Sequence, residues 1–350
     1  MGRKHFLAHL AHVELITPKL DQSVAFFKNV VGLDEVERDD KSVYLRCWGD
    51  YYHHSLILTQ GDQPALGHGS WRTQGPEELE QAVASIEASG THGEWIERSV
   101  GHGRAYRFRG HDGHAMEVFW EVDRYKASPE QRSNYPDRPQ RRIARGIAPR
   151  QLDHLTVAAN DVRGTAAWNR DVLGFRIMAY IPFDPDPRRA VFAVTTTNET
   201  SHDLGVAGDF SGVPGRVHHL AFWMEESEDL LRAADLLIES GAPIEFGPGR
   251  HGIGEQMYLY FREPGGLRIE LNSLGYRNYV PDWEPVDWQG TEGPNSMYRN
   301  VEMPPSMFEA FPPAAGPVVG EPEMAMSSSL MGEAHGIKGG AELPTGATKE

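Results

Sequence analysis

The chain has 350 residues, which is enough for two domains that each bury a sizeable core. Its formal net charge is −16, and a surface of that sign repels phosphate backbones, so we expect no nucleic-acid partner. The single cysteine, Cys47, cannot form an intrachain disulfide, and no apolar run approaches the roughly 20 residues that span a bilayer. The N-terminal residues also lack the apolar core of a secretion signal. We therefore expect a protein of the reducing cytoplasm with no membrane partner.

The first half of the chain carries histidines and a carboxylate on strand-like runs, separated by helical stretches. His12 lies in an alternating apolar run, and the amphipathic stretch after it stops at Gly32. His68 and Glu117 follow in contexts that are rich in glycine and apolar residues. Between these two, residues 76–89 have the pattern of a helix.

The second half of the chain repeats this arrangement. Two pairs are separated by 142 residues, His12 with His154 and Gly32 with Gly174. His68 matches His219 at an offset of 151 residues, and Glu117 matches Glu270 at an offset of 153. Offsets that rise along the chain indicate short loop insertions in the second copy rather than a new architecture. A repeat of this length indicates duplicated domains, not a short-period solenoid.

A smaller unit recurs within each copy. In the second copy, helices are predicted at residues 163–172 and 227–240, and strands at 152–157, 189–195, 202–207, 217–222, 257–261 and 267–272. The order is a strand, a helix and then two or three further strands. The sequence therefore predicts an α+β fold of four tandem βαβββ modules that form two domains.

The modules divide the chain into four parts. We expect a non-catalytic N-terminal domain at 1–135, a linker at 136–150, a catalytic C-terminal domain at 151–311 and a flexible tail at 312–350. The linker is basic, as expected of a solvated segment that pairs with an acidic surface. An aromatic flap after Glu270 should cover a site or pack a subunit interface; its residues are Tyr276, Tyr279, Trp283, Trp288 and Tyr298.

His154, His219 and Glu270 are the candidate metal ligands of the second copy. Two imidazoles and one carboxylate can hold one face of a metal ion and leave the other positions open. A lone histidine on an apolar strand is more often a core residue, but three metal-type residues at matching places favour a metal site. Adjacent side chains on a strand point to opposite faces, so only one of His218 and His219 should reach the site. The spacing of the surrounding apolar residues favours His219.

The first copy keeps its own set, so the working copy has to be chosen. Tyr260 lies ten residues before Glu270, whereas Arg107 lies ten residues before Glu117. A phenol can donate a hydrogen bond to a metal-bound oxygen, while a guanidinium adds fixed positive charge beside a cation. We therefore place the working site in the second copy and interpret the first as a degenerate site retained for folding.

Three residues of the second copy could take part in proton chemistry. His202 and His251 carry imidazoles suited to moving a proton near neutral pH. Tyr260 carries the phenol described above. The alternatives are a strand-end histidine, a surface histidine and a half-buried core tyrosine, respectively. The glycines around His251 are no phosphate loop, because the strand, lysine and helix of that motif are missing.

Residues from about 7 to 300 resemble the type I extradiol ring-cleaving dioxygenases of the vicinal oxygen chelate superfamily, and most of all the catechol 2,3-dioxygenases. The motifs are Gly247-Pro248-Gly249-Arg250-His251-Gly252, Tyr258-Leu259-Tyr260, Glu263-Pro264-Gly265-Gly266 and Arg268-Ile269-Glu270. The resemblance implies that His154, His219 and Glu270 bind iron. It also implies that His202 is an acid/base residue, that His251 and Tyr260 hold the substrate, and that the chain forms a homo-oligomer, most often a tetramer.

The activity implied is Fe(II)-dependent cleavage of a catechol by dioxygen, beside the diol, with Mn(II) as the alternative metal. Phe246, just before the His251 loop, is apolar where the homoprotocatechuate enzymes tend to be basic, and Ile253 after the loop is apolar too. We therefore expect catechol or an alkyl- or halocatechol to be the substrate. A homoprotocatechuate-type enzyme and another metal-dependent enzyme of the superfamily are the alternatives. A drug-sequestering binding protein on the same fold is a third, although such proteins generally lack the metal ligands.

Overall fold

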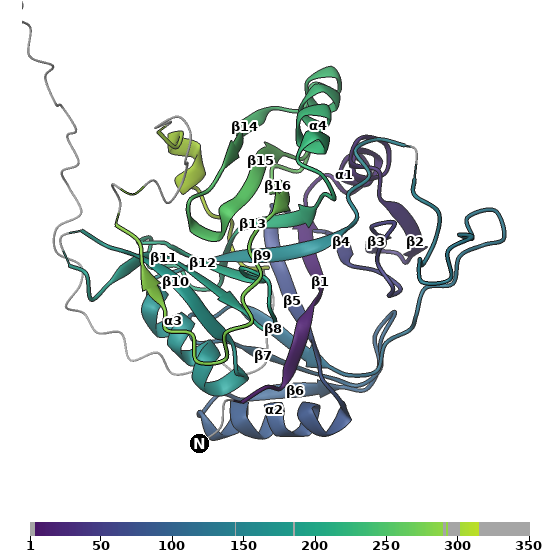
Figure 1. Ribbon diagram of the computed structural model, residues 1–350. Helices are drawn as coiled ribbons and strands as arrows, with labels where there is room; N and C mark the ends of the chain where they lie inside the picture. The colour runs from purple at the N-terminus through teal and green to yellow at the C-terminus, as the bar shows by residue number, and fades with distance from the viewer. Residues whose placement is uncertain (1–3, 144, 185, 290–291, 293–301, 315–350) are drawn as a thin grey trace, which may run out of the picture. The chain divides into compact units, whose positions relative to one another are not determined.

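The computed structural model describes residues 4–143, 145–184, 186–289, 292 and 302–314. Two β-sheets carry the fold, one from each half of the chain (Figure 1). None of the helices in these residues is both long enough and apolar enough to cross a membrane. Tyr298 and all of the predicted tail after residue 314 lie outside the described residues.

Each sheet is built from two modules with the same element order. The first module is β1 (Leu7–Thr17), α1 (Leu20–Phe26), β2 (Asp34–Arg38), β3 (Ser42–Arg46) and β4 (Leu56–Gln60). The second is β5 (Ala65–Thr73), α2 (Pro76–Ala88), β6 (Gly93–Ile96), β7 (Ala105–Arg109) and β8 (Ala115–Phe119). The third is β9 (Gln151–Ala159), α3 (Val162–Trp168), β10 (Arg176–Pro182), β11 (Ala190–Thr196) and β12 (Leu204–Gly208). The fourth is β13 (Arg216–Trp223), α4 (Glu228–Glu239), β14 (Ile244–Arg250), β15 (Gln256–Arg262) and β16 (Arg268–Leu274). The predicted α+β fold of four tandem βαβββ modules is confirmed.

The two modules of each sheet meet at their first strands. The strand order is β2-β3-β4-β1-β5-β8-β7-β6 in one sheet and β14-β15-β16-β13-β9-β12-β11-β10-β17 in the other, where β17 is Val286–Asp287. In both sheets the first strands pair antiparallel, and each first strand also pairs in parallel with the last strand of its own module. The strands predicted to carry metal-type residues are therefore neighbours at the centre of each sheet.

The first helix of each half explains why the histidine pair and the glycine pair share one offset of 142 residues. Both α1 and α3 continue into a single wider, π-helical turn that ends at a glycine, Gly32 or Gly174. These glycines have φ of 89° and 84°, which glycine adopts without strain. A Cβ atom on Gly32 would lie 2.4 Å from the Arg145 carbonyl oxygen, so the glycine also permits close packing of the linker.

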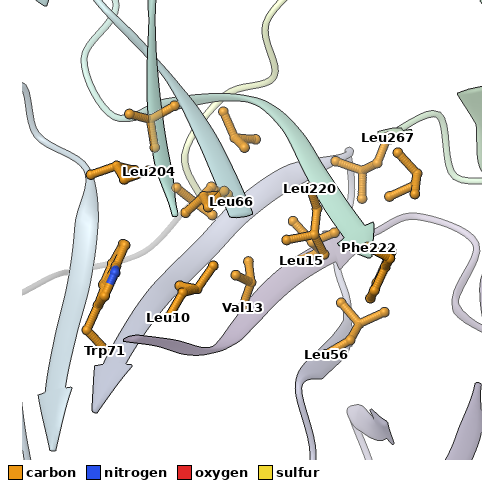
Figure 2. Close-up of a cluster of buried hydrophobic side chains, with 14 of the residues drawn as sticks. Leu10, Val13, Leu15, Leu56, Leu66, Trp71, Leu204, Leu220, Phe222 and Leu267 are labelled. Carbon is orange, nitrogen blue, oxygen red and sulfur yellow. The ribbon is translucent and has the colours of Figure 1, made fainter. Parts of the chain in front are cut away.

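One hydrophobic core joins the two sheets. Val13 and Leu15 of β1 belong to the same buried cluster as Leu220 and Phe222 of β13 (Figure 2). Because side chains alternate along a strand, the residues between these apolar ones lie on the opposite face of their sheet. Leu155 on β9 faces the core in the same way, so alternation places the metal-type residues of both halves on the faces away from it.

The linker packs against both halves of the chain, and the aromatic flap packs onto the second sheet. Arg142 and Arg150 of the linker form ion pairs with Glu225, as expected of a basic segment against an acidic surface. In the flap, Tyr276, Trp283 and Trp288 pack on a buried cluster built mainly from β10 and β11; Tyr279 is exposed.

Three strands of the second sheet were not predicted: β10 and β14, which belong to its modules, and the two-residue β17 at its edge. Residues 176–182 of β10 do not alternate in polarity, because one face of the strand packs on the shared core and the other on a second apolar cluster. In β14 the glycines around Pro248 suggested a loop, but the segment pairs with β15 across register shifts. His202 was expected to begin a strand, whereas β12 begins two residues later, at Leu204.

Candidate active site

Three metal-type side chains of the second half meet on the outer face of its sheet. His154 Nε2 and His219 Nε2 lie 3.0 Å apart, and they lie 3.2 and 3.0 Å from Glu270 Oε2. Ala221 brings the three strands together, since it pairs with His154 on one side and with Glu270 on the other. All three side chains are buried.

The geometry and chemistry of these donors fit a divalent metal ion. Donors at right angles, about 2.1 Å from one ion, lie about 3.0 Å apart, close to the spacing found here. Glu270 Oε2 is buried and accepts no hydrogen bond of good geometry from the described residues. A buried carboxylate oxygen of this kind requires a cation, and burial of the two imidazoles beside it makes a metal ion more favourable than two protons.

The protonation of the histidines depends on this carboxylate. Burial raises the pKa of Glu270, but His154 and His219 outweigh burial and hold that pKa well below its ordinary range. Burial lowers the pKa of His154, yet Asp153 and Glu270 raise it to about 9. Burial also lowers the pKa of His219, to about 4. One positive charge is therefore favoured at this point, and a metal ion that binds there displaces a proton from His154.

Asp153 fixes the orientation of the His154 ring. Its Oδ2 atom accepts a hydrogen bond from His154 Nδ1 at 2.7 Å, and it also accepts hydrogen bonds from Asn272 at 2.7 Å and Gln256 at 3.3 Å. With the Nδ1 proton held in this way, the lone pair of His154 Nε2 faces Glu270 and His219. A carboxylate behind a histidine in this position makes the ring a better ligand.

His218 fixes His219 by a similar arrangement. Simple alternation would place the two rings on opposite faces, but a β-bulge between Val217 and His219 brings their Nδ1 atoms to 2.6 Å. His218 Nε2 donates to the carbonyl oxygen of Met307 at 2.6 Å, so its Nδ1 atom accepts from His219 Nδ1. The lone pair of His219 Nε2 is thereby directed at the site.

The residues predicted to move protons surround the three donors. The His202 ring lies 4.2 Å from the His154 ring, and burial, followed by the charge of His154, lowers the pKa of His202 well below its usual value. His251 Nε2 lies 3.1 Å from the Tyr260 hydroxyl. Burial, followed by the charge of Glu270, raises the pKa of Tyr260 well above its usual value. The structure thus brings together a neutral imidazole that can accept a proton and a phenol that stays a donor.

Apolar side chains form two clusters on the same face of the sheet as these groups. On one side, Phe246 stacks on Tyr258 with ring centroids 4.8 Å apart, and Met303 and Met307 pack on Tyr260 and these two rings. Tyr258 belongs to a sequence motif that gives it no role of its own. The two methionines could not be predicted, because no periodicity or motif marks residues 302–311.

Ile253 belongs to the second apolar cluster, together with residues of β10 and β11. Thr156 lies two residues after His154 on β9 and therefore on the same face. Thr156 pairs with Gly205, and Gly205 pairs with Val194. Ile253 packs with Val194, which places it on the metal-ligand face of the sheet.

The first half also brings its metal-type residues together. His12 Nε2 lies 3.3 Å from His68 Nε2 and 3.7 Å from Glu117 Oε1. His102, which the repeat did not reveal, joins them with its Nε2 atom 3.4 Å from Glu117 Oε1. The register places Arg107 opposite Glu117 and Tyr260 opposite Glu270, so the positions compared in the sequence are equivalent.

Both halves of the chain match one family model, that of the glyoxalase/bleomycin resistance protein/dioxygenase superfamily, at residues 9–118 and 151–271. The chain belongs to this superfamily. It is 40% identical over 290 residues to a manganese-dependent 2,3-dihydroxybiphenyl 1,2-dioxygenase of Geobacillus genomosp. 3, a match that covers 82% of this chain and 91% of the relative. It is 38% identical over 291 residues to a metapyrocatechase of Geobacillus stearothermophilus, covering 83% and 88%.

Solved structures agree with this placement among the dioxygenases of the superfamily. The homoprotocatechuate 2,3-dioxygenase of Arthrobacter globiformis superposes with a TM-score of 0.79 and 26% identity, covering 92% of this chain and 97% of that one. The predicted assignment to the extradiol dioxygenases is confirmed at the level of these relatives. The Geobacillus genomosp. 3 relative is named as manganese-dependent. A further relative, from Rhodococcus jostii (strain RHA1), is named as an iron-dependent extradiol dioxygenase; it is 23% identical, over 73% of this chain and 85% of the relative. A metal-dependent chemistry is consistent with the buried donors described above.

Proposed function

We propose that this extradiol dioxygenase opens the ring of catechol, or of an alkyl- or halocatechol, beside its two hydroxyl carbons. One catechol and one dioxygen give one 2-hydroxymuconic semialdehyde. The observation that carries the proposal is the buried Glu270 oxygen, which faces two imidazole nitrogens and accepts no hydrogen bond of good geometry within the described part of the chain. We propose Fe(II) as the metal, with Mn(II) as the alternative, on His154, His219 and Glu270.

When bound, the metal supplies a Lewis acid on which both catechol oxygens can be held, together with an open position for dioxygen. His202 then accepts a proton from a catechol hydroxyl, which its neutral imidazole allows. The same imidazolium returns the proton as the ring opens. Tyr260 keeps its proton and donates a hydrogen bond to substrate oxygen, and His251 holds the phenol in position.

We expect a preference for an uncharged ring substituent because Phe246 and Ile253 belong to apolar clusters. Phe246 and Ile253 contribute only carbon to the site, and a carboxylate placed against them would lose hydration without gaining a partner. A homoprotocatechuate-type substrate is the second candidate, favoured by the structural similarity to that enzyme. The 2,3-dihydroxybiphenyl of the Geobacillus relative is a third candidate, because an aryl substituent is also apolar.

The decisive experiment is a reconstitution of the purified full chain. Metal-free protein is loaded anaerobically with Fe(II) or with Mn(II) and mixed with oxygenated catechol, 3-methylcatechol, 2,3-dihydroxybiphenyl or 3,4-dihydroxyphenylacetate. We expect yellow product and matching oxygen uptake with the first three, and much lower kcat/KM with the carboxylated ring. Protein that binds metal but consumes no oxygen with any catechol would overturn the proposal and favour a sequestering binding protein.

Two variants separate the proposed roles of the residues. His202→Phe should keep the metal and lose turnover by about 10²- to 10⁴-fold, the usual range for loss of an acid/base residue. Glu270→Ala should lose the metal itself. Normal turnover by Glu270→Ala protein that metal analysis shows to be empty would refute the ligand assignment.

We also propose that residues 151–311 form the catalytic domain and that the chain assembles as a homo-oligomer, with a tetramer favoured. The family resemblance supports both statements. Light scattering of the loaded enzyme measures the subunit number, and a monomer at micromolar concentration would contradict the assembly.

A further inference from the structure

A second cluster of imidazoles and one carboxylate lies in the first half of the chain, on the face of its sheet opposite the shared core. His12 comes from β1, His68 from β5 and Glu117 from β8, while His102 lies in the loop before β7. All four residues are at most 3% exposed. The ligand atoms of His12, His102 and Glu117 lie within 4.8 Å of one another, and His68 Nε2 lies 3.8 Å from Glu117 Oε1.

Hydrogen bonds at the far side of two rings leave their Nε2 atoms as lone pairs. His68 Nδ1 lies 2.8 Å from Glu14 Oε2 and donates to it, and His102 Nδ1 lies 3.0 Å from the Gly103 carbonyl oxygen and donates to that. The Nε2 atoms of both rings therefore face Glu117 Oε1 as acceptors. This is the arrangement that Asp153 imposes on His154 in the other half.

The cluster holds more hydrogen-bond acceptors than donors. A proton on His12 Nε2 can serve one atom among His68 Nε2, His102 Nε2 and Glu117 Oε1. Ser70 donates its hydroxyl proton to Glu117 Oε1 at 2.7 Å, and this one proton is not shared with the ring nitrogens. Lone pairs that converge in a buried space call for a cation, and burial disfavours imidazolium as that cation.

Arg107 does not fill this need. Its Nη2 and Nε atoms lie 2.8 and 3.2 Å from Glu117 Oε2, the oxygen that points away from the imidazoles. The guanidinium is partly exposed, at 28% for the side chain, so solvent screens part of its charge. Arg107 should weaken the binding of a cation at Glu117 Oε1, but it does not occupy the position of that cation.

We propose that the first half of this chain holds a second divalent metal ion, of the zinc type, on His12, His68, His102 and Glu117. Four donors around one ion with bonds of 2.0–2.1 Å define a tetrahedron with edges of about 3.3–3.5 Å, and four of its six edges, at 3.3–3.8 Å, lie close to that value here. His68 lies outside the set of atoms that are all within 4.8 Å of one another, so His68 and His102 should draw together around the ion. The second half offers three donors with edges of 3.0–3.2 Å. With its fourth donor the first site can close around the ion, whereas the second keeps positions open.

The ion of the first half is structural rather than catalytic. A closed shell of four protein donors leaves no position for a substrate. The Phe119 ring also covers the cluster, with its centroid 4.6 Å from the His102 ring and 5.7 Å from the His12 ring. The ion should tie β1, β5 and β8 to the loop that carries His102, and so stabilise the first half.

The test uses the full-length protein carrying Glu270→Ala, which removes the proposed catalytic metal and leaves the first half intact. Metal-free protein is incubated with Zn²⁺, freed of excess metal by gel filtration and analysed for zinc per chain. We expect one zinc ion in Glu270→Ala, none when Glu117→Ala is added, and two in the parent chain. Diffraction at the zinc absorption edge should place the ion between His12 and Glu117.

Two further variants keep the outcome interpretable. His102→Ala changes only a loop and should weaken zinc binding in the Glu270→Ala background by at least tenfold, with unchanged circular dichroism. Arg107→Gln removes the opposing charge and should tighten binding severalfold, which a purely structural role of Arg107 does not predict. Folded Glu270→Ala protein that retains no zinc would overturn the second site, and this result is independent of whether the parent enzyme cleaves catechol.

Discussion

Removal of Asp153 should weaken metal binding at the proposed ligands His154, His219 and Glu270 without changing any of them. The carboxylate accepts three hydrogen bonds at its Oδ2 atom, from His154, Asn272 and Gln256. In Asp153→Asn the amide oxygen can still accept from all three donors, but the charge is lost. In Asp153→Ala the His154 ring loses its acceptor altogether.

The size of the effect follows from the kind of bond that is lost. A hydrogen bond to a charged group contributes about 1.5–3 kcal/mol and a neutral one about 0.5–1.5 kcal/mol, so the Asn variant should lose about 1 kcal/mol, or roughly fivefold in affinity. Loss of a carboxylate behind a metal-binding histidine generally reduces metal affinity by about 10- to 100-fold. Asp153 also borders a cavity of about 570 Å³ from which water can reach the vacated space. The Ala variant should therefore lie near the tenfold end.

The assay is a competition for metal between the protein and a chelator of known affinity, run anaerobically with Fe(II) and repeated with Mn(II). Asp171→Asn is the matched control, because Asp171 is an exposed carboxylate that pairs with Arg170 and not with a proposed ligand. We expect the order parent, Asn variant, Ala variant in falling affinity. Equal affinity of the parent and the Ala variant, within twofold, would refute the role of Asp153 in orienting His154.

Three other predictions concern buried polar groups. His218→Ala removes the acceptor of His219 Nδ1 and should lower metal affinity about tenfold in the same competition. Burial raises the pKa of Asp203 from its ordinary value of 3.8 to about 7. The contribution of Asp203 to stability is therefore complete below pH 3.8 and is lost as the pH rises toward 7. In Asp203→Asn the fall in Tm across this pH range should be smaller than in the parent. Burial raises the pKa of Glu245, but Arg268 and Arg262 outweigh it and lower the pKa to about 2. Stability from Glu245 is therefore present above 4.5 and lost as the pH falls toward 2, so Glu245→Gln should show a smaller drop in Tm between about pH 5 and pH 3 than the parent. An unchanged pH profile in either variant would contradict the corresponding pKa.

The repeat made the fold predictable from the sequence alone. A histidine and a glycine recur at one constant offset because each pair sits on equivalent elements, a first strand and the end of the helix after it. Alternation along β9, β13 and β16 then places His154, His219 and Glu270 on one face, since their apolar neighbours face the shared core. Local periodicity and duplication were sufficient for this much.

The details around the ligands depend on contacts that periodicity does not encode. The bulge at His218 is a register shift between two strands, and it appears only when β13 pairs with β9. Met307 reaches the site from a segment without periodic pattern. His102 joins the first cluster from the loop before β7, which is equivalent to the His251 loop before β15 in the second half. The two histidines lie 15 and 19 residues before Glu117 and Glu270, so the repeat did not align them. The bulge and the contact of Met307 are long-range features without a signature in the neighbouring sequence.

The two halves share a scaffold and differ at the ladder positions beside each carboxylate. Glu117 lies between Ser70 and Arg107, whereas Glu270 lies between Ala221 and Tyr260. In the first half, a hydroxyl and a guanidinium both bind Glu117, so this carboxylate should hold an ion less strongly than Glu270 does. In the second half, an alanine and a phenol stand at these two positions. The same three-strand geometry can thus support both of the proposed sites, a closed one that His102 completes in the first half and an open one in the second.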